Sequence, residues 1–173
     1  MEPPLNPVGE FVKDENCSAE RIAELIAEIE RAPTALRNVV AGLSEEQLDT
    51  KYRNWTIRQI AHHLADSHVN SYVRFKWTLT EHQPTIKAYF EDRWVALEDS
   101  SAGAINTSLA LYEAIHARWV QLLRTMKPAD FARSFVHPET GQTVRLDAAL
   151  CYYPWHARHH TGQIAWLRKQ HGW

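Results

Sequence analysis

The chain has 173 residues, 19 Lys and Arg against 21 Asp and Glu, and a formal net charge of -2. Hydrophobic residues make up 45% and charged residues 23%, which is typical of a globular protein and excludes a disordered one. The sequence contains no basic block and no run of about 18 apolar residues, so we expect neither nucleic-acid binding nor a membrane span. The length predicts one domain over residues 1–173.

The two cysteines, Cys17 and Cys151, belong to no CxxC motif. A disulfide framework is therefore not expected, and a reducing cytoplasm is the predicted location. Residues 1–17 hold three prolines and one glycine, which predicts an extended arm. This arm lacks the basic and apolar regions of a signal peptide.

The first long helix is predicted to begin after Ser18, a good N-cap residue. Pro33 is expected to kink or interrupt this helix. A capping box at residues 44–47 predicts a short helix, and a second capping box at residues 56–59 opens the second long helix. The apolar stripes of these two long helices are Ile22, Leu25, Ile26 and Ile29, and Ile57, Ile60, Ala61, Leu64, His68, Tyr72 and Phe75.

Residues 84–104 show no sustained period and predict a long connection, with a short helix near Trp94. A third long helix is predicted from Asn106 to Met126, and a small hairpin turns at residues 138–141. Asp147 is expected to cap a fourth long helix that reaches Gln170 and bends at Pro154. These elements predict an all-α fold, a four-helix bundle with one long crossover connection and a small hairpin before the last helix.

Ten histidines are the unusual feature of the composition, and three of them lie within five residues near the C-terminus. His156 and His160 are four residues apart, so they share one face of the last helix and can bind one small cation. A hydrogen-bonded pair that faces a polar crevice or solvent is the alternative. His159 lies off that line, where it either supports a ligand or faces solvent.

A second cluster, formed by His62, His63 and His68, lies on the second long helix. Periodicity places His68 at the centre of the apolar stripe, His63 on its flank and His62 on the exposed side. It favours His68 as the buried residue but does not select a third metal ligand. His116, on the third helix, is expected to be a hydrogen-bonded core or edge histidine.

The run from Trp55 to Ser67, followed far downstream by the run from His156 to Ile164, resembles the DinB/YfiT-like family, and within it the YfiT branch of metal-dependent hydrolases. The similarity extends to nearly the whole chain. It implies a four-helix bundle with a metal bound by His63, His156 and His160, and so overrules the preference for His68. Some relatives carry a further histidine where Gln163 stands, which makes Gln163 a candidate fourth ligand. We favour the alternative that Gln163 donates a hydrogen bond to bound water or substrate. The shorter matching runs are residues 7–11, 48–53, 71–76 and 172–173.

Three neutral imidazoles leave the charge of a divalent ion intact, which activates water for hydrolysis of a small-molecule substrate. Zinc is the expected metal, although nickel, iron and manganese also accept imidazole ligands. The resemblance leaves two alternatives open, a transferase that uses a low-molecular-weight thiol such as bacillithiol or mycothiol, and a non-catalytic metal-binding bundle. It also implies a homodimer. No catalytic acid or base is assigned, although Asp66, Tyr153 and Arg158 lie near the proposed site or its edge.

Overall fold

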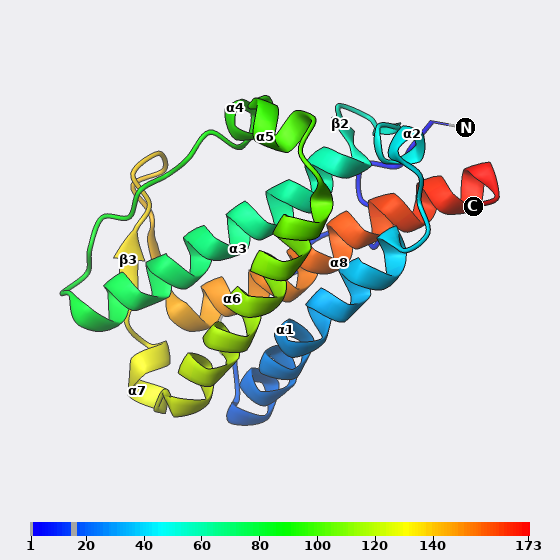
Figure 1. Cartoon of the computed structure of the whole chain (residues 1–173). Coiled ribbons are helices and arrows are strands. Elements are labelled where there is room, and N and C mark those ends of the chain that lie inside the picture. The colour runs from blue at the N-terminus through cyan, green and yellow to red at the C-terminus, as the bar shows by residue number, and fades with distance from the viewer. Residues whose placement is uncertain (1, 15–16) are drawn as a thin grey trace.

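The computed structural model describes residues 2–14 and 17–173, and its architecture is a bundle of four long helices (Figure 1). These helices are α1 (Ala19–Val40), α3 (Ile57–Thr80), α6 (Ile105–Thr125) and α8 (Leu146–His171). The predicted all-α four-helix bundle is therefore confirmed. Among the described residues, every helix is too short or too polar to cross a membrane.

The connectivity of the bundle places α1 diagonally opposite α3, and α6 diagonally opposite α8. Helix α1 packs against α6 and α8, and α3 packs against the same two helices. The chain crosses from α1 to α3 through α2 (Glu45–Leu48) and a two-stranded ribbon of β1 (Lys51–Tyr52) and β2 (Trp55–Thr56). Both predicted capping boxes are present, with Ser44 capping α2 and Thr56 capping α3.

The connection between α3 and α6 runs back along α3 and contains α4 (Glu91–Val95) and α5 (Glu98–Ser101) (Figure 1). Arg58 holds this connection to the start of α3, because its buried guanidinium donates to the Gly103 carbonyl at 3.0 Å. The expected short helix near Trp94 is confirmed as α4.

After α6, the chain forms the short α7 (Pro128–Phe131) and an antiparallel hairpin of β3 (Ser134–Val136) and β4 (Thr143–Arg145), as predicted. The strand β4 runs directly into α8, whose N-cap is Arg145. The expectation that Asp147 caps this helix is therefore wrong. The Asp147 carboxylate instead accepts from the Ala148 N–H at 2.8 Å and pairs with Arg145.

The prolines within the helices do not interrupt them. Pro33 lies inside α1 and Pro154 inside α8, and each helix continues as one element through its proline, so the expected interruption of α1 is not seen. Each proline removes one backbone donor from its helix. Since both helices bury residues before and after the proline, tertiary packing outweighs the loss of that single hydrogen bond.

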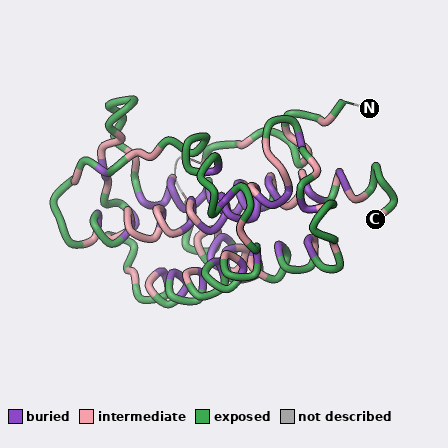
Figure 2. The backbone as a smooth tube through the Cα atoms, turned by 45° about the horizontal axis from the view of Figure 1, so that its top comes forward, coloured by how far each residue is buried: buried purple, intermediate pink, exposed green. Residues whose placement is uncertain are grey.

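Buried residues line the interior of the bundle along all four helices (Figure 2). They form two separate apolar clusters, one at each end of the bundle. On α6, the first cluster ends at Tyr112 and the second begins at Trp119, and buried His116 lies between them. On α3, buried His68 occupies the corresponding gap between Ala65 and Phe75. The middle of the core is therefore a layer of imidazoles.

The described residues 2–14 form neither helix nor strand, and a turn interrupts the predicted extended arm where the Gly9 N–H donates to the Asn6 carbonyl at 3.2 Å. Positions 1, 15 and 16 of the predicted arm lie outside the described residues. Side chains of the bundle hold the arm through its carbonyl groups. Tyr52 donates to the carbonyl of Pro4, and the Trp155 indole donates to that of Gly9 at 3.0 Å. A Cβ atom on Gly162 of α8 would lie 2.8 Å from Val8 Cγ1, so glycine permits this close approach.

Candidate metal centre

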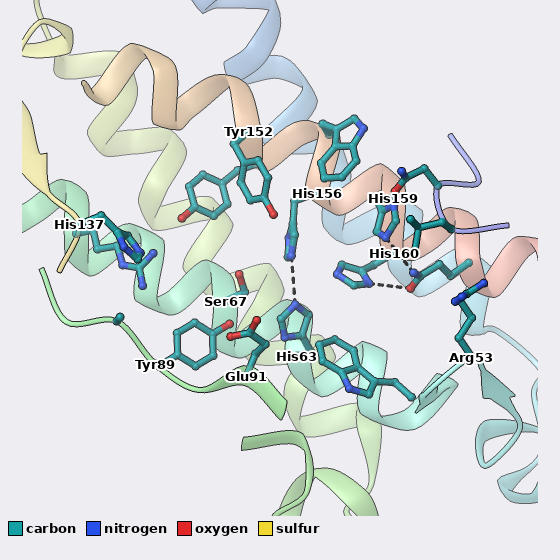
Figure 3. A pocket seen from close by; sticks show the side chains of 18 of the residues that line it. Arg53, His63, Ser67, Tyr89, Glu91, His137, Tyr152, His156, His159 and His160 are labelled. Atoms are coloured by element: carbon teal, nitrogen blue, oxygen red, sulfur yellow. Dashed lines mark hydrogen bonds between the residues drawn. The ribbon is translucent and has the colours of Figure 1, made fainter. Parts of the chain in front are cut away.

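Three buried histidines from two helices converge in the interior of the bundle (Figure 3). His63 comes from α3, and His156 and His160 lie one turn apart on α8. One ring nitrogen of each lies within 4.8 Å of the others, and the Nε2 atoms of His63 and His156 are 3.2 Å apart. Two nitrogen ligands about 2.0–2.1 Å from a tetrahedral zinc ion are roughly 3.4 Å apart, so this pair can bind a single ion.

Aromatic packing fixes the rings of the triad. The Trp55 indole lies 4.6 Å from the His63 ring and stacks on His160 at 5.9 Å, measured between ring centroids. Trp55 is positioned by its place in β2, immediately before the cap of α3, and by a 3.1 Å hydrogen bond from its indole to Asp92. The flank of α3 that bears His63 is therefore covered rather than exposed.

The Nδ1 atoms of His156 and His160, the two triad histidines on α8, contact other side chains. His160 Nδ1 donates to Gln163 Oε1 at 2.8 Å, and Gln163 Nε2 donates to His159 Nε2 at 2.9 Å. His156 Nδ1 lies 3.3 Å from His68 Nε2. Gln163 therefore supports His160 through its oxygen, while the expected hydrogen bond to water or substrate remains a prediction. The preference for His68 identified a buried residue that contacts the triad from behind.

Burial keeps the imidazoles of the triad neutral at pH 7. Desolvation lowers the pKa of His63 to about 3 and holds those of His156 and His160 well below the usual range, and neighbouring imidazoles act in the same direction. A neutral imidazole has a nitrogen lone pair, and the neutral ring is the form that binds a metal ion. His63 Nδ1 is buried without a hydrogen-bond partner among the described residues. This donor set suits a divalent transition metal.

A cavity of about 490 Å³ adjoins the triad and gives a bound molecule access to it. Its size suits a small-molecule ligand. Tyr89, Glu91 and Tyr152 lie around it together with His63 and His156 (Figure 3), and residues Leu5 and Asn6 of the arm contribute to its wall. The cavity therefore has aromatic walls, charged groups and one face formed by three imidazoles.

The remaining sequence candidates have different positions. Asp66, whose pKa is raised to about 6 by burial and then by Asp99, does not hydrogen-bond to His63. Among the described residues, His63 Nε2 faces His156 and His63 Nδ1 has no partner. Arg158 pairs with Glu28 of α1 and does not line this cavity, whereas Tyr153 does.

The expectation that His62 is exposed is wrong, because the α3–α6 connection and the start of α6 cover it. Its Nδ1 lies 2.7 Å from Ser108 Oγ and its Nε2 lies 3.1 Å from the Gly103 carbonyl. His116 is buried and hydrogen-bonded, as expected, with its Nδ1 2.6 Å from the Ile29 carbonyl.

The fold agrees with comparisons to known proteins. Residues 28–164 match the model of the DinB superfamily, and the chain belongs to this family.

The chain is 45% identical over 169 residues to a protein of Bacillus mycoides (strain KBAB4) named "Putative metal-dependent hydrolase", with 96% of each chain covered. A protein of the same name from Bacillus cereus (strain 03BB102) is 46% identical over the same length. Among solved structures, YfiT from Bacillus subtilis superposes with a TM-score of 0.94 at 44% identity and 97% coverage of both chains. That structure is described as a probable metal-dependent hydrolase with an unusual four-helix bundle topology.

Proposed function

We propose that His63, His156 and His160 bind one divalent metal ion, zinc in the first instance, and that the chain is a metal-dependent hydrolase acting on a small molecule. The observation that carries this proposal is the convergence of three buried, neutral imidazoles on one side of an accessible cavity. The names of the relatives support the same class of activity. Nickel, iron and manganese are the alternative metals, since all accept imidazole nitrogen.

A divalent ion held by three neutral ligands supplies Lewis acidity and lowers the pKa of its bound water towards about 7. The protein contributes orientation and a shaped environment. Gln163 Oε1 accepts a hydrogen bond from His160 Nδ1, so the Nε2 atom of His160 is free to bind the ion. Trp55 shields His63 and His160 on one side, while the cavity leaves the other side open for substrate.

The first test is elemental analysis of the purified protein and of H63A, H156A and H160A. We expect close to one ion per chain in the parent protein and a major loss in each variant. H62Q is the matched control, because His62 is also a buried histidine of α3 but contacts Ser108 and Gly103 instead of the triad. Full metal retention by H63A would show that a different residue of α3 is the ligand.

The second test separates the possible activities. The metal-loaded protein is incubated with activated esters and other electrophiles, with and without a low-molecular-weight thiol. We expect turnover in buffer alone, and its loss in H63A. Consumption that requires the thiol would instead identify a thiol S-transferase of the bacillithiol- or mycothiol-dependent kind. Inertness in both conditions across a broad substrate panel would favour a non-catalytic metal-binding bundle.

The remaining expectations also belong to this proposal. We propose one domain over residues 1–173, a cytoplasmic location and a homodimer. The cytoplasmic location rests on the sequence, which has two cysteines and no CxxC motif. The homodimer rests on the family resemblance alone, and sedimentation analysis of the purified protein tests it.

A further inference from the structure

A continuous row of polar groups crosses the bundle behind the triad and takes one member from each long helix. The Ile29 carbonyl of α1 lies 2.6 Å from His116 Nδ1 of α6. His116 Nε2 lies 2.9 Å from His68 Nδ1 of α3, and His68 Nε2 lies 3.3 Å from His156 Nδ1 of α8. The three imidazoles are 1%, 0% and 6% exposed in this order, which leaves little room for solvent to compete for their nitrogens.

The row begins at a carbonyl group that the sequence itself makes available. In an α-helix, the carbonyl of residue i accepts from the N–H of residue i+4. The residue four positions after Ile29 is Pro33, which has no N–H. The Ile29 carbonyl is therefore left without its helical donor, and His116 Nδ1 is the group that reaches it.

The Ile29 carbonyl sets the direction of every hydrogen bond in the row, because a carbonyl oxygen can only accept. In a neutral imidazole, one ring nitrogen donates and the other accepts. His116 must donate from Nδ1 and accept at Nε2. His68 must then donate from Nδ1 to His116 and accept at Nε2, and His156 must donate from Nδ1 to His68. The Nε2 atom of His156 is left with a bare lone pair, 3.2 Å from His63 Nε2.

We propose that this row, from the Ile29 carbonyl through His116 and His68, fixes the Nδ1–H tautomer of His156 and directs its Nε2 lone pair to the metal centre. His68 and His116 are positioning residues that act through His156. Pro33 contributes by freeing the carbonyl that starts the row. The identity of the bound ion rests on the proposed function, but the tautomer does not, since it is already specified in the metal-free protein.

The direct test is ¹⁵N NMR of metal-free protein labelled in its histidine rings, with single His→Gln variants to assign the signals. We expect the proton on Nδ1 in His116, His68 and His156. His62 provides the internal reference, because its Nε2 faces the Gly103 carbonyl and must carry the proton there. A proton on Nε2 of His156, with that ring also lacking one on Nδ1, would overturn the proposal.

The second test measures zinc affinity by chelator competition. H68L removes both hydrogen bonds of His68, and we expect zinc to bind about 10–100-fold more weakly, the usual effect of losing a group that supports a metal ligand. H68Q should bind zinc within a few-fold of the parent, because the amide offers an acceptor towards His156 and a donor towards His116. H116F should weaken binding less than H68L does. H62Q is the control for replacing a buried histidine.

Comparison of H68L with H68Q separates positioning from packing. Equal loss of affinity in both variants would overturn the positioning role, since only H68Q preserves the hydrogen-bond polarity. If H68L does not fold, H116F decides, because it interrupts the row without touching His156; unchanged affinity and an unchanged His156 tautomer in H116F would refute the proposal. Failure of the parent to bind any metal would contradict the proposed function while the NMR result still decides the tautomer.

Discussion

Lowering the pH from 7.5 to 5.5 should remove several kcal/mol of stability from the metal-free protein, up to about 7 kcal/mol. Burial lowers the pKa of His63 to about 3 and that of His116 to about 4, and it holds the pKa of three further histidines well below the ordinary value. These three are His68, His156 and His160. In the unfolded chain each should titrate near the reference pKa of about 6.5.

The unfolded state therefore binds more protons than the folded state below pH 6.5, and stability must rise with pH in that range. The contribution of each group is complete above about pH 6.5 and is lost as the pH falls towards its folded-state pKa. Between pH 7.5 and 5.5, one such histidine costs about 1 kcal/mol, and five cost at most about 7 kcal/mol, an upper bound because these imidazoles contact one another. Since domains of this size unfold with about 5–15 kcal/mol, the metal-free protein should approach its unfolding midpoint near pH 5.5.

The assay is urea unfolding in the presence of a chelator at pH 7.5, 6.5 and 5.5, followed by tryptophan fluorescence, for which fully buried Trp119 is a suitable reporter. H68Q retains polar contacts but removes one titrating group, so its pH slope should fall by about one fifth. Repetition at high salt screens the exposed charges and should leave most of the slope intact. A loss smaller than about 2 kcal/mol for the parent protein would refute the reasoning.

Three other contacts in the structure, those of Gln163, Arg58 and the two cysteines, also have measurable consequences. Q163L should weaken zinc binding about tenfold, because it removes the acceptor for His160 Nδ1, whereas Q163E should retain much of the affinity; chelator competition measures both. R58M should lower the free energy of unfolding by about 1–3 kcal/mol, since it removes hydrogen bonds to two backbone carbonyls and two carboxylates, and unchanged urea unfolding would contradict this. Diamide should join Cys17 to Cys151, whose sulfur atoms are 2.8 Å apart, with the loss of two free thiols measured by thiol titration. Burial raises the pKa of Cys151 to about 12, so this oxidation should be slow at neutral pH, and two thiols that persist after prolonged treatment would argue against the contact.

Helix periodicity and capping patterns predicted the four long helices because these signals are local. The capping box at Thr56 and the apolar stripe of α3 both appear in the structure. The predicted start of a helix was less accurate where a neighbouring element joins it directly. The hairpin strand β4 runs into α8 at Arg145, two residues before the predicted cap.

The histidines illustrate the limit of periodicity more clearly. A helical stripe indicates which face is buried most deeply, and it correctly selected His68 as buried. It did not reveal that Trp55 and α8 also cover the flank that bears His63, or that the distant Gly103 and Ser108 cover His62. Such long-range contacts are not encoded in the local pattern. The assignment of His63 therefore depended on the family resemblance, and its role as a ligand stays a prediction.

The way the N-terminal arm is attached has a consequence for how substrate preference can evolve. Tyr52, Arg53 and Trp155 grip main-chain oxygens of the arm, which every amino acid possesses. Leu5 and Asn6, which line the cavity, can thus be substituted while these hydrogen bonds still hold the arm in place. Evolution can therefore alter the cavity wall at these two positions without changing the three histidines of the triad.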